Sequence, residues 1–360
     1  MNGIGTLLFI LITNGKSPAY LGSSFAFIAP ANIVISKYGY PYALGGFVAV
    51  GFCGCLLAFI IKKCGTKWID IVLPPAAMGP VVALIGLELS ATAANNAGLL
   101  GNNIEAANVW VFLITLGVAI VGNICFKRFL SVIPILIAII CGYISAICFG
   151  LVDFSTVINA PLFALPNFTA PKFDINAILM ILPVLLVITS EHIGHQVVTG
   201  KIIGRDLIKD PGLHRSLLGD NFSTMISGLI GSVPTTTYGE NIGVMALNKI
   251  YSVYVIAGAA VIAVVMSFIG KISALLSSIP TPVIGGISIA LFGVIASSGL
   301  KILVENKIDF DNKKNLLIAS VILVSGIGGL TLQVAGLQIT GVAFSTLLGI
   351  ILYQILPEKD

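Results

Sequence analysis

Long apolar runs separated by short polar breaks repeat along the whole chain. A helix needs about 20 mainly apolar residues to cross a bilayer, so each run is a candidate membrane span. Thirteen spans are predicted, at 2–13, 19–36, 41–61, 69–89, 108–125, 130–150, 175–198, 212–231, 235–250, 251–270, 281–299, 314–330 and 338–356. With 57% hydrophobic and only 9% charged residues, the chain is predicted to be an all-α polytopic membrane protein.

The 19 lysines and arginines lie unevenly on the two sides that these spans define. Three belong to one side, Lys37, Lys172 and Lys271, and the other sixteen belong to the opposite side. Because short cytoplasmic loops retain positive charge, the richer side is predicted to face the cytoplasm, together with the C-terminus. We therefore expect a multi-pass protein of the cell membrane. The net charge of +4 is too small and too dispersed to indicate a nucleic-acid partner.

The chain resembles itself at a shift near 207 residues. Pro74, Gly79 and Gly86 align with Pro280, Gly285 and Gly293, and the stretch from Asn108 aligns with the stretch from Asn315. The corresponding spans face opposite ways by the loop charges, as in the inverted repeats of many secondary transporters. Segment 175–198 lacks a counterpart, so we expect one span to be missing before Met1. The alternative is that thirteen spans are the complete protein.

Two acidic residues, Glu191 and Glu240, are predicted to lie inside the membrane. The other acidic residues, Asp220 among them, are expected in loops or at their edges. An ionisable side chain at the centre of a span costs about 2.5–3.5 kcal/mol, so one that is present marks a functional site. His195 follows Glu191 by four residues and shares its helix face, where it can relay a proton or form a structural pair. His192 points elsewhere and is interpreted as a structural residue.

Two predicted spans contain breaks in their helical pattern. SPAYLGSSFAFIAP, at 17–30, and VPTTTYGENIGV, at 233–244, combine proline, glycine and hydroxyl residues. Backbone groups freed at such breaks are tolerated in a membrane only where protein or a polar cavity covers them. Paired broken spans, one in each repeat, indicate a transporter binding site. Their N–H donors and the two glutamates would match a ligand with alternating N–H and C=O groups.

These residues resemble the nucleobase–ascorbate transporter family over essentially the whole chain. The family signature reads here as Glu240-Asn241-Ile242-Gly243, four residues, then Asn248-Lys249, with Asn248 in place of the usual threonine. The stretches SSFAFI, SEHIGHQ and PTTTYGENIGV also resemble the family. Glu240, where other members have glutamine, resembles the bacterial uracil branch more than the xanthine branch. The resemblance implies a seven-plus-seven inverted repeat with core and gate domains, about thirteen spans being present here, and short strands in two interrupted spans.

The resemblance also implies roles for individual residues. Glu191 and Glu240 would accept hydrogen bonds from uracil, and the backbone N–H groups of Phe25 and Gly239 would donate to its carbonyls. Tyr238 would pack beside the ring. The remaining roles are proton coupling by Glu191, His195 and Glu240, and a gate-domain contact by Phe292, which stands where the closest uracil carriers are expected to have tyrosine.

The predicted function is proton-coupled uracil symport by alternating access, without enzymatic activity, cofactor or metal. Predicted partners are uracil, protons and the lipid bilayer, with a homodimer as an open alternative. The expected core domain comprises 1–65 and 175–270, the gate domain 66–152 and 271–360, and an extracytoplasmic linker 153–174. Lacking a wall of the core domain, the shortened chain is expected to transport poorly.

Three alternatives remain at this point. The first is a carrier of the same fold for xanthine, urate or another nucleobase. The second is an intramembrane metalloprotease built on Glu191, His192 and His195, although a zinc motif needs two histidines four residues apart. The third is a channel, which the absence of a ring of charged positions disfavours.

Overall fold

The computed structural model describes residues 1–66, 68–69, 74–100, 104–334 and 337–357. The chain divides into two compact units. Unit 1 contains Met1–Leu84, Asn167–Val265 and Ser298–Asp360, and unit 2 contains Ile85–Pro166 and Met266–Ser297. Each unit therefore draws on segments from both halves of the sequence.

Unit 1 contains the two interrupted segments. Its first part consists of α1 (Asn2–Ile12), β1 (Leu21–Ser23), η1 (Phe25–Phe27), α2 (Ile28–Tyr38) and α3 (Tyr40–Cys64). Its middle part consists of α10 (Ile175–Ile181), α11 (Val184–Ile203), η3 (Ile208–Gly212), α12 (Leu213–Leu229), β2 (Thr235–Thr237), α13 (Gly239–Asn248) and α14 (Val253–Met266). Its last part consists of α17 (Lys313–Ile327), β3 (Thr331–Val334), β4 (Leu337–Thr340) and α18 (Gly341–Ile355).

Unit 2 is mostly helical. It contains α6 (Ser90–Asn96), α7 (Ala106–Cys125), η2 (Arg128–Val132), α8 (Pro134–Cys148), α9 (Ser155–Asn159) and α15 (Gly270–Ser277). Two further helices, α5 (Pro75–Glu88) and α16 (Thr281–Glu305), pass from one unit into the other.

The helix ends follow from local sequence chemistry. The carboxylate of Asp174 accepts hydrogen bonds from the backbone N–H groups of Asn176 and Ala177, at 2.9 and 3.0 Å, and so caps α10. Pro183 separates α10 from α11, because proline cannot continue the helical hydrogen-bond ladder. Gly204, in the left-handed conformation, ends α11. The predicted span at 175–198 is therefore two consecutive helices.

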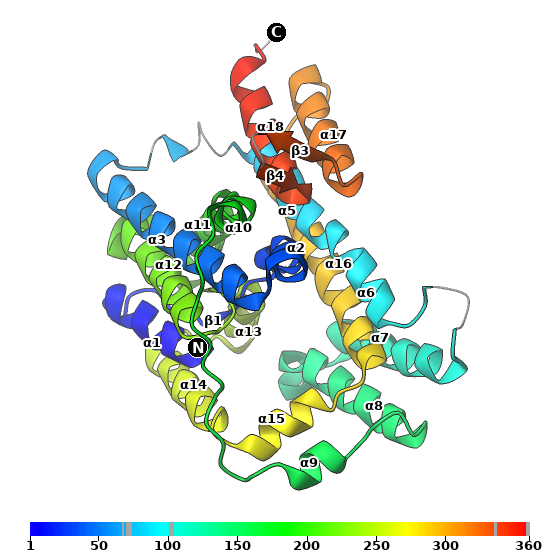
Figure 1. Cartoon of the computed structure of the whole chain (residues 1–360). Coiled ribbons are helices and arrows are strands. Elements are labelled where there is room, and N and C mark those ends of the chain that lie inside the picture. The colour runs from blue at the N-terminus through cyan, green and yellow to red at the C-terminus, as the bar shows by residue number, and fades with distance from the viewer. Residues whose placement is uncertain (67, 70–73, 101–103, 335–336, 358–360) are drawn as a thin grey trace. The chain divides into compact units, whose positions relative to one another are not determined.

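Helices α3 and α12 pack along one another, and α1 lies against α12 (Figure 1). Small residues permit this close packing in a membrane protein. A side chain at Gly51 of α3 would place its Cβ 2.5 Å from the backbone nitrogen of Met225 on α12. Beside this contact, α2, α3, α10 and α11 enclose an apolar core that includes Phe27, Leu44 and Ile181.

The two interrupted segments meet as predicted. Strands β1 and β2 pair antiparallel, with Leu21 opposite Thr237, Gly22 opposite Thr236 and Ser23 opposite Thr235 (Figure 1). Both strands are only three residues long and continue directly into helical segments. A short sheet inside the helical bundle thus replaces the helical hydrogen bonds that proline, glycine and threonine remove.

The predicted spans agree with the described elements, with one difference. Each span contains a helix or a strand followed by a helix, and residues 70–73 of the predicted span 69–89 lie outside the described residues. Within the described residues, five helical segments are long and apolar enough to cross a membrane: Tyr40–Cys64, Pro75–Asn96, Ala106–Cys125, Ile175–Ile203 and Thr281–Glu305. The difference is the β3–β4 hairpin, in which Thr331 pairs with Thr340. Residues 338–340, predicted to begin the last span, belong to this hairpin because the backbone there is extended.

Candidate functional site

Backbone hydrogen bonds extend the β1–β2 pairing at both ends. The Ser24 N–H donates to the carbonyl of Pro234 at 2.9 Å, and the Tyr238 N–H donates to the carbonyl of Tyr20 at 3.1 Å. All three residues of β2 are buried. The crossing is therefore a fixed frame that holds the first residue of η1, Phe25, and the first residue of α13, Gly239, on neighbouring segments.

Hydroxyl groups from the surrounding helices bind the backbone of the two strands. Thr6 on α1 accepts a hydrogen bond from the Leu21 N–H at 2.9 Å. On α12, the hydroxyl of Thr224 donates to the Thr235 carbonyl at 2.6 Å, and Ser223 bonds the Thr235 hydroxyl at 2.7 Å. Buried polar backbone needs such partners, since lipid offers none. The threonine and serine residues of α1 and α12 thus make the broken segments stable.

Tyr238 is positioned by β1. Its hydroxyl donates to the carbonyl of Ser23 at 3.0 Å and lies 3.0 Å from the Ser23 Oγ. Its ring stacks with the ring of Phe25, with centroids 6.3 Å apart and planes inclined by 3°. The ring lies directly over Gly22, where an added Cβ would collide with it. The sequence thus brings two predicted site residues, Phe25 and Tyr238, together as a pair of parallel rings.

The hydroxyl of Thr237 lies between two histidines of α11. Its Oγ1 is 3.2 Å from Nδ1 of His195 and 3.3 Å from Nδ1 of His192. Gly239 lies close to the imidazole of His195, since a Cβ at Gly239 would be 2.9 Å from its Nε2. His195 therefore contacts the start of α13, and a hydroxyl connects it to the neighbouring histidine.

His192 and Asp220 form a buried pair that sequence reasoning missed. The exposed fractions are 0% for His192 and 1% for Asp220, and Nδ1 of His192 is 3.7 Å from Oδ2 of Asp220. The expectation that Asp220 lies at a loop edge is wrong, because α12 begins at Leu213 and Asp220 is two turns inside it. The polar run from Asp220 to Thr224 within an apolar segment was the available signal.

The two predicted acidic site residues are described to different extents. Glu191 lies on α11, is partly buried, and is close enough to Asp220 to act on its carboxyl group electrostatically. Glu240 is the second residue of α13, and its side chain lies outside the described part of the structure. Phe292 lies on α16 in unit 2 and is buried there.

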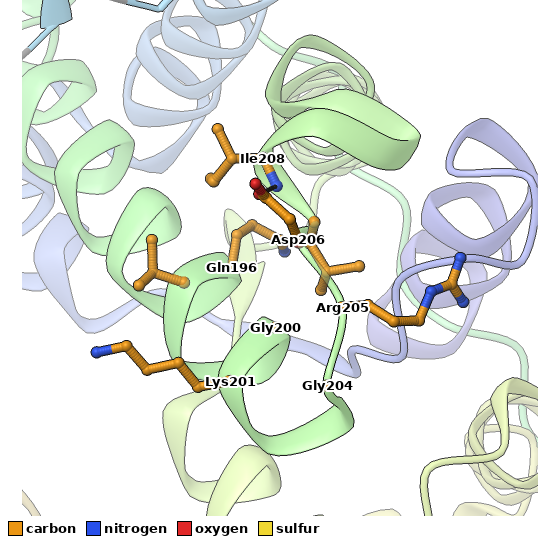
Figure 2. Close-up of a pocket in the computed structure, with 9 residues that line it drawn as sticks. Gln196, Gly200, Lys201, Gly204, Arg205, Asp206 and Ile208 are labelled. Carbon is orange, nitrogen blue, oxygen red and sulfur yellow. Dashed lines mark hydrogen bonds between the residues drawn. The ribbon is translucent and has the colours of Figure 1, made fainter.

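A separate pocket of about 420 Å³ lies at the end of α11 (Figure 2). It is lined by Gln196, Val197, Gly200, Lys201, Gly204, Arg205, Asp206, Leu207 and Ile208. Its basic side chains, Lys201 and Arg205, point away from one another (Figure 2). None of the predicted site residues lines this pocket. Among the described side chains, no group of three or more histidine, cysteine or acidic residues is arranged to hold a metal ion.

Known proteins resemble the chain over nearly its whole length. A family model described as a permease family matches residues 1–335. A uracil permease of Paenibacillus larvae is 52% identical over 98% of this chain and 85% of its own length. A uracil permease of Escherichia coli K12 is 49% identical over 97% of this chain and 82% of its own length.

A solved structure shares the fold. The transmembrane domain of the cyanobacterial bicarbonate transporter BicA superposes with a TM-score of 0.64 at 14% identity, covering 98% of this chain and 93% of that domain. At this identity the likeness concerns the fold alone. The predicted fold class, a helical membrane transporter with a seven-plus-seven inverted repeat, is confirmed.

Proposed function

Because the chain belongs to the nucleobase–ascorbate family of permeases, we propose that it moves uracil together with protons across the cytoplasmic membrane. The proposal depends on one observation: the chain is 52% and 49% identical in sequence to two uracil permeases over almost its whole length. The family consists of transporters, so the chain is not an enzyme, and the metalloprotease alternative is excluded.

Uracil recognition is proposed at the β1–β2 crossing. Uracil is planar and alternates N–H donors with C=O acceptors around its edge. Glu191 and Glu240 would accept from the N–H groups, and the backbone N–H groups of Phe25 and Gly239 would donate to the carbonyls. The proposal is supported by helix geometry at Gly239, because the first N–H groups of a helix have no partner within that helix.

The ring of Tyr238 would pack against the base. Its hydroxyl is already bonded to Ser23, so the ring orientation is fixed before any ligand arrives. A fixed contact loses little conformational entropy on binding, which favours affinity. The flat face that Tyr238 presents suits an aromatic heterocycle rather than a linear solute.

Proton coupling is proposed for Glu191, His195 and Glu240. A buried carboxylate is costly unless a second group balances its charge. A proton taken up near Glu191 would supply that balance when uracil binds. His195 is one turn from Glu191 on α11 and contacts Thr237 at 3.2 Å, so it is suited to exchange a proton near the substrate.

Transport would follow an alternating-access cycle between two domains. We propose a core of 1–65 and 175–270 that carries the uracil site, and a gate of 66–152 and 271–360 that contributes Phe292, with 153–174 as the linker. Uracil and a proton would bind from outside, and release would follow when the core moves relative to the gate.

The proposed orientation has the lysine-rich loops and the C-terminus in the cytoplasm. Contacts within unit 1 support the sidedness. Lys16 pairs with Asp210 at 2.6 Å, and both belong to loops assigned to the cytoplasmic side. Tyr40 donates to the carbonyl of Gly231 at 3.0 Å, and both belong to loops assigned to the opposite side.

The experiment is labelled uracil uptake by cells that make residues 1–360, with and without an inward proton gradient. Xanthine, urate and other pyrimidines are added as competitors. Unlabelled uracil is added in a parallel sample. The proposal is supported if unlabelled uracil, and none of the other bases, abolishes the uptake of labelled uracil, and if this uptake is lost when the proton gradient is removed. Stronger competition by xanthine or urate would assign the chain to the alternative, a carrier of another nucleobase.

A further inference from the structure

Among the described residues of unit 1, His192 and Asp220 form a fully buried ionisable pair to which the proposed function gives no role. Both side chains are inaccessible to solvent, and Nδ1 of His192 is 3.7 Å from Oδ2 of Asp220. Each also has a buried polar atom without a hydrogen-bond partner, Nε2 of His192 and Oδ1 of Asp220. Buried polar groups normally have partners, so one added proton changes which atoms of the pair can bond to one another.

The surroundings restrict where a proton on this pair can go. From α1, the ring of Phe9 packs edge-on against His192, with centroids 6.2 Å apart. The titratable groups that act on the pair are Glu191 and His195, both on α11. From β2, Thr237 contributes a hydroxyl at 3.3 Å from His192, and the Thr236 side chain and the Thr237 backbone N–H lie beside the Asp220 carboxyl group. On the side of α1 the apolar ring of Phe9 offers no group that could accept a proton. On the side of the proposed substrate site the Thr237 hydroxyl can accept one.

The charge balance of the pair suits the storage of one proton. Neutral imidazole next to a carboxylate has a charge of −1, and one added proton makes the pair neutral, either as imidazolium with carboxylate or as imidazole with carboxylic acid. In a coupled pair of this kind the proton belongs to both groups. A neutral pair is much cheaper to bury than a charged one.

We propose that the His192–Asp220 pair holds the proton that accompanies uracil, and that the Thr237 hydroxyl passes it to His195. In the transfer, the carboxyl proton of Asp220 moves to Nδ1 of His192. His192 then donates its Nδ1 proton to the Thr237 oxygen, while the Thr237 hydroxyl proton moves to Nδ1 of His195. The pair returns to imidazole and carboxylate, and His195 carries the proton until it is released. This inference rests on the proposed function, because it assigns the proton site of that transport.

The test is the pH dependence of the uracil dissociation constant of the purified full chain. Binding of uracil and of the proton favour one another in a symporter, so the affinity falls as the pH rises through the titration of the pair. One linked proton weakens binding about tenfold for each pH unit above that point. The variants Asp220→Asn and His192→Gln should bind uracil with an affinity that changes less than about twofold over the same range.

His214→Gln is the matched control, because His214 lies at the start of α12, away from the pair, and should keep the wild-type pH dependence. If Asp220→Asn and His192→Gln keep the tenfold dependence, the inference is wrong. The inference is equally wrong if sodium ions, and not protons, set the uracil affinity of the wild-type chain.

A second measurement, of the protonation of the pair itself, needs no uracil and compares the wild type with two variants. Infrared difference spectra of the wild-type chain between acid and alkaline buffer should contain the carbonyl stretch of a neutral carboxylic acid. That band should disappear in Asp220→Asn and shift its titration in His192→Gln. A band unaffected by both substitutions overturns the inference. If the wild-type chain does not bind uracil but its infrared band responds to both substitutions, the proposed function is contradicted and the inference about the pair is not.

Discussion

At the scale of single residues, one hydroxyl connects the chemistry of the site. Thr237 lies in β2 and contacts both His192 and His195, so the strand pairing positions its hydroxyl between the two imidazoles of α11. The hydroxyl can accept from one ring and donate to the other. A side chain of the same shape without the oxygen would leave the strand intact and remove the connection.

We therefore expect Thr237→Val to slow proton-driven uracil uptake on the order of tenfold while the pH dependence of uracil binding stays near that of the wild type. The reason is that the substitution removes a path for the proton without removing the groups that hold it. Initial uptake rates and equilibrium binding, measured on the same preparation, separate the two effects. A rate equal to wild type would contradict the role of the hydroxyl.

Gly22 gives a second prediction at this scale. The ring of Tyr238 occupies the space that a side chain at Gly22 would need, so Gly22→Ala must displace the ring. We expect uracil binding to weaken about tenfold, or about 1.4 kcal/mol. Gly117→Ala is the control, because nothing lies within 4 Å of a Cβ at Gly117. Equilibrium binding of labelled uracil to both variants measures the effect, and equal affinities would exclude Tyr238 from the site.

Single residues were predictable from the sequence where their chemistry conflicts with a membrane. Glu191 was identifiable because a carboxylate is expensive inside an apolar span. Asp220 was missed because its span contains charged residues near one end, so its depth depends on where α12 begins. His192 was interpreted as structural because its partner is 28 positions away, and no local spacing reveals such a pair.

At the scale of elements, the broken spans were predictable and the hairpin was not. Proline, glycine and consecutive threonines disfavour a helix at both breaks, and β1 and β2 form there. The β3–β4 hairpin has neither proline nor consecutive threonines, and each of its strands is only four residues long, so it is harder to separate from a helical stretch. Its residues were therefore assigned to a gap and to the start of a span.

The packing of α3 on α12 leads to a third prediction. A side chain at Gly51 would meet backbone atoms of α12, which cannot move aside as a flexible side chain could. We expect Gly51→Leu to destabilise unit 1 by at least about 1–3 kcal/mol, the usual cost of overpacking. Thermal unfolding in detergent should show a lower midpoint for Gly51→Leu than for Gly117→Leu. Equal midpoints would mean that the two helices are not in close contact.

The ion pair between Lys16 and Asp210 gives a prediction about pH. The ammonium group of Lys16 holds the pKa of the Asp210 carboxyl below its ordinary value of 3.8. A lowered pKa means that the pair stabilises the folded state above the unfolded-state pKa and loses that effect as the pH falls through the folded-state pKa. Asp210→Asn should therefore lower the melting midpoint slightly at neutral pH and not in acid. An equal difference in melting midpoint between wild type and Asp210→Asn in neutral and acid buffer would contradict the ion pair. Added salt should reduce the difference seen at neutral pH, because it screens the two charges.

At the scale of the whole molecule, the order of the spans and the repeat were the most predictable features. Apolar length and loop charge act over many residues, so errors at single positions average out. The domain boundaries stay a prediction, as do the roles of Glu240 and Phe292. The substrate cannot be read from periodicity; it follows from the short polar breaks and from the relatives that share them.

The central claim is that the paired broken segments of unit 1 and Glu191 of α11 form a uracil site. Its most direct test is equilibrium binding of labelled uracil to the purified chain and to Glu191→Gln, with His214→Gln as the control. We predict saturable binding to the wild type and to the control, and a loss of at least about a hundredfold in affinity for Glu191→Gln, because an acceptor becomes a mismatched amide. Wild-type affinity in Glu191→Gln, or no saturable binding in the wild type, would contradict the claim.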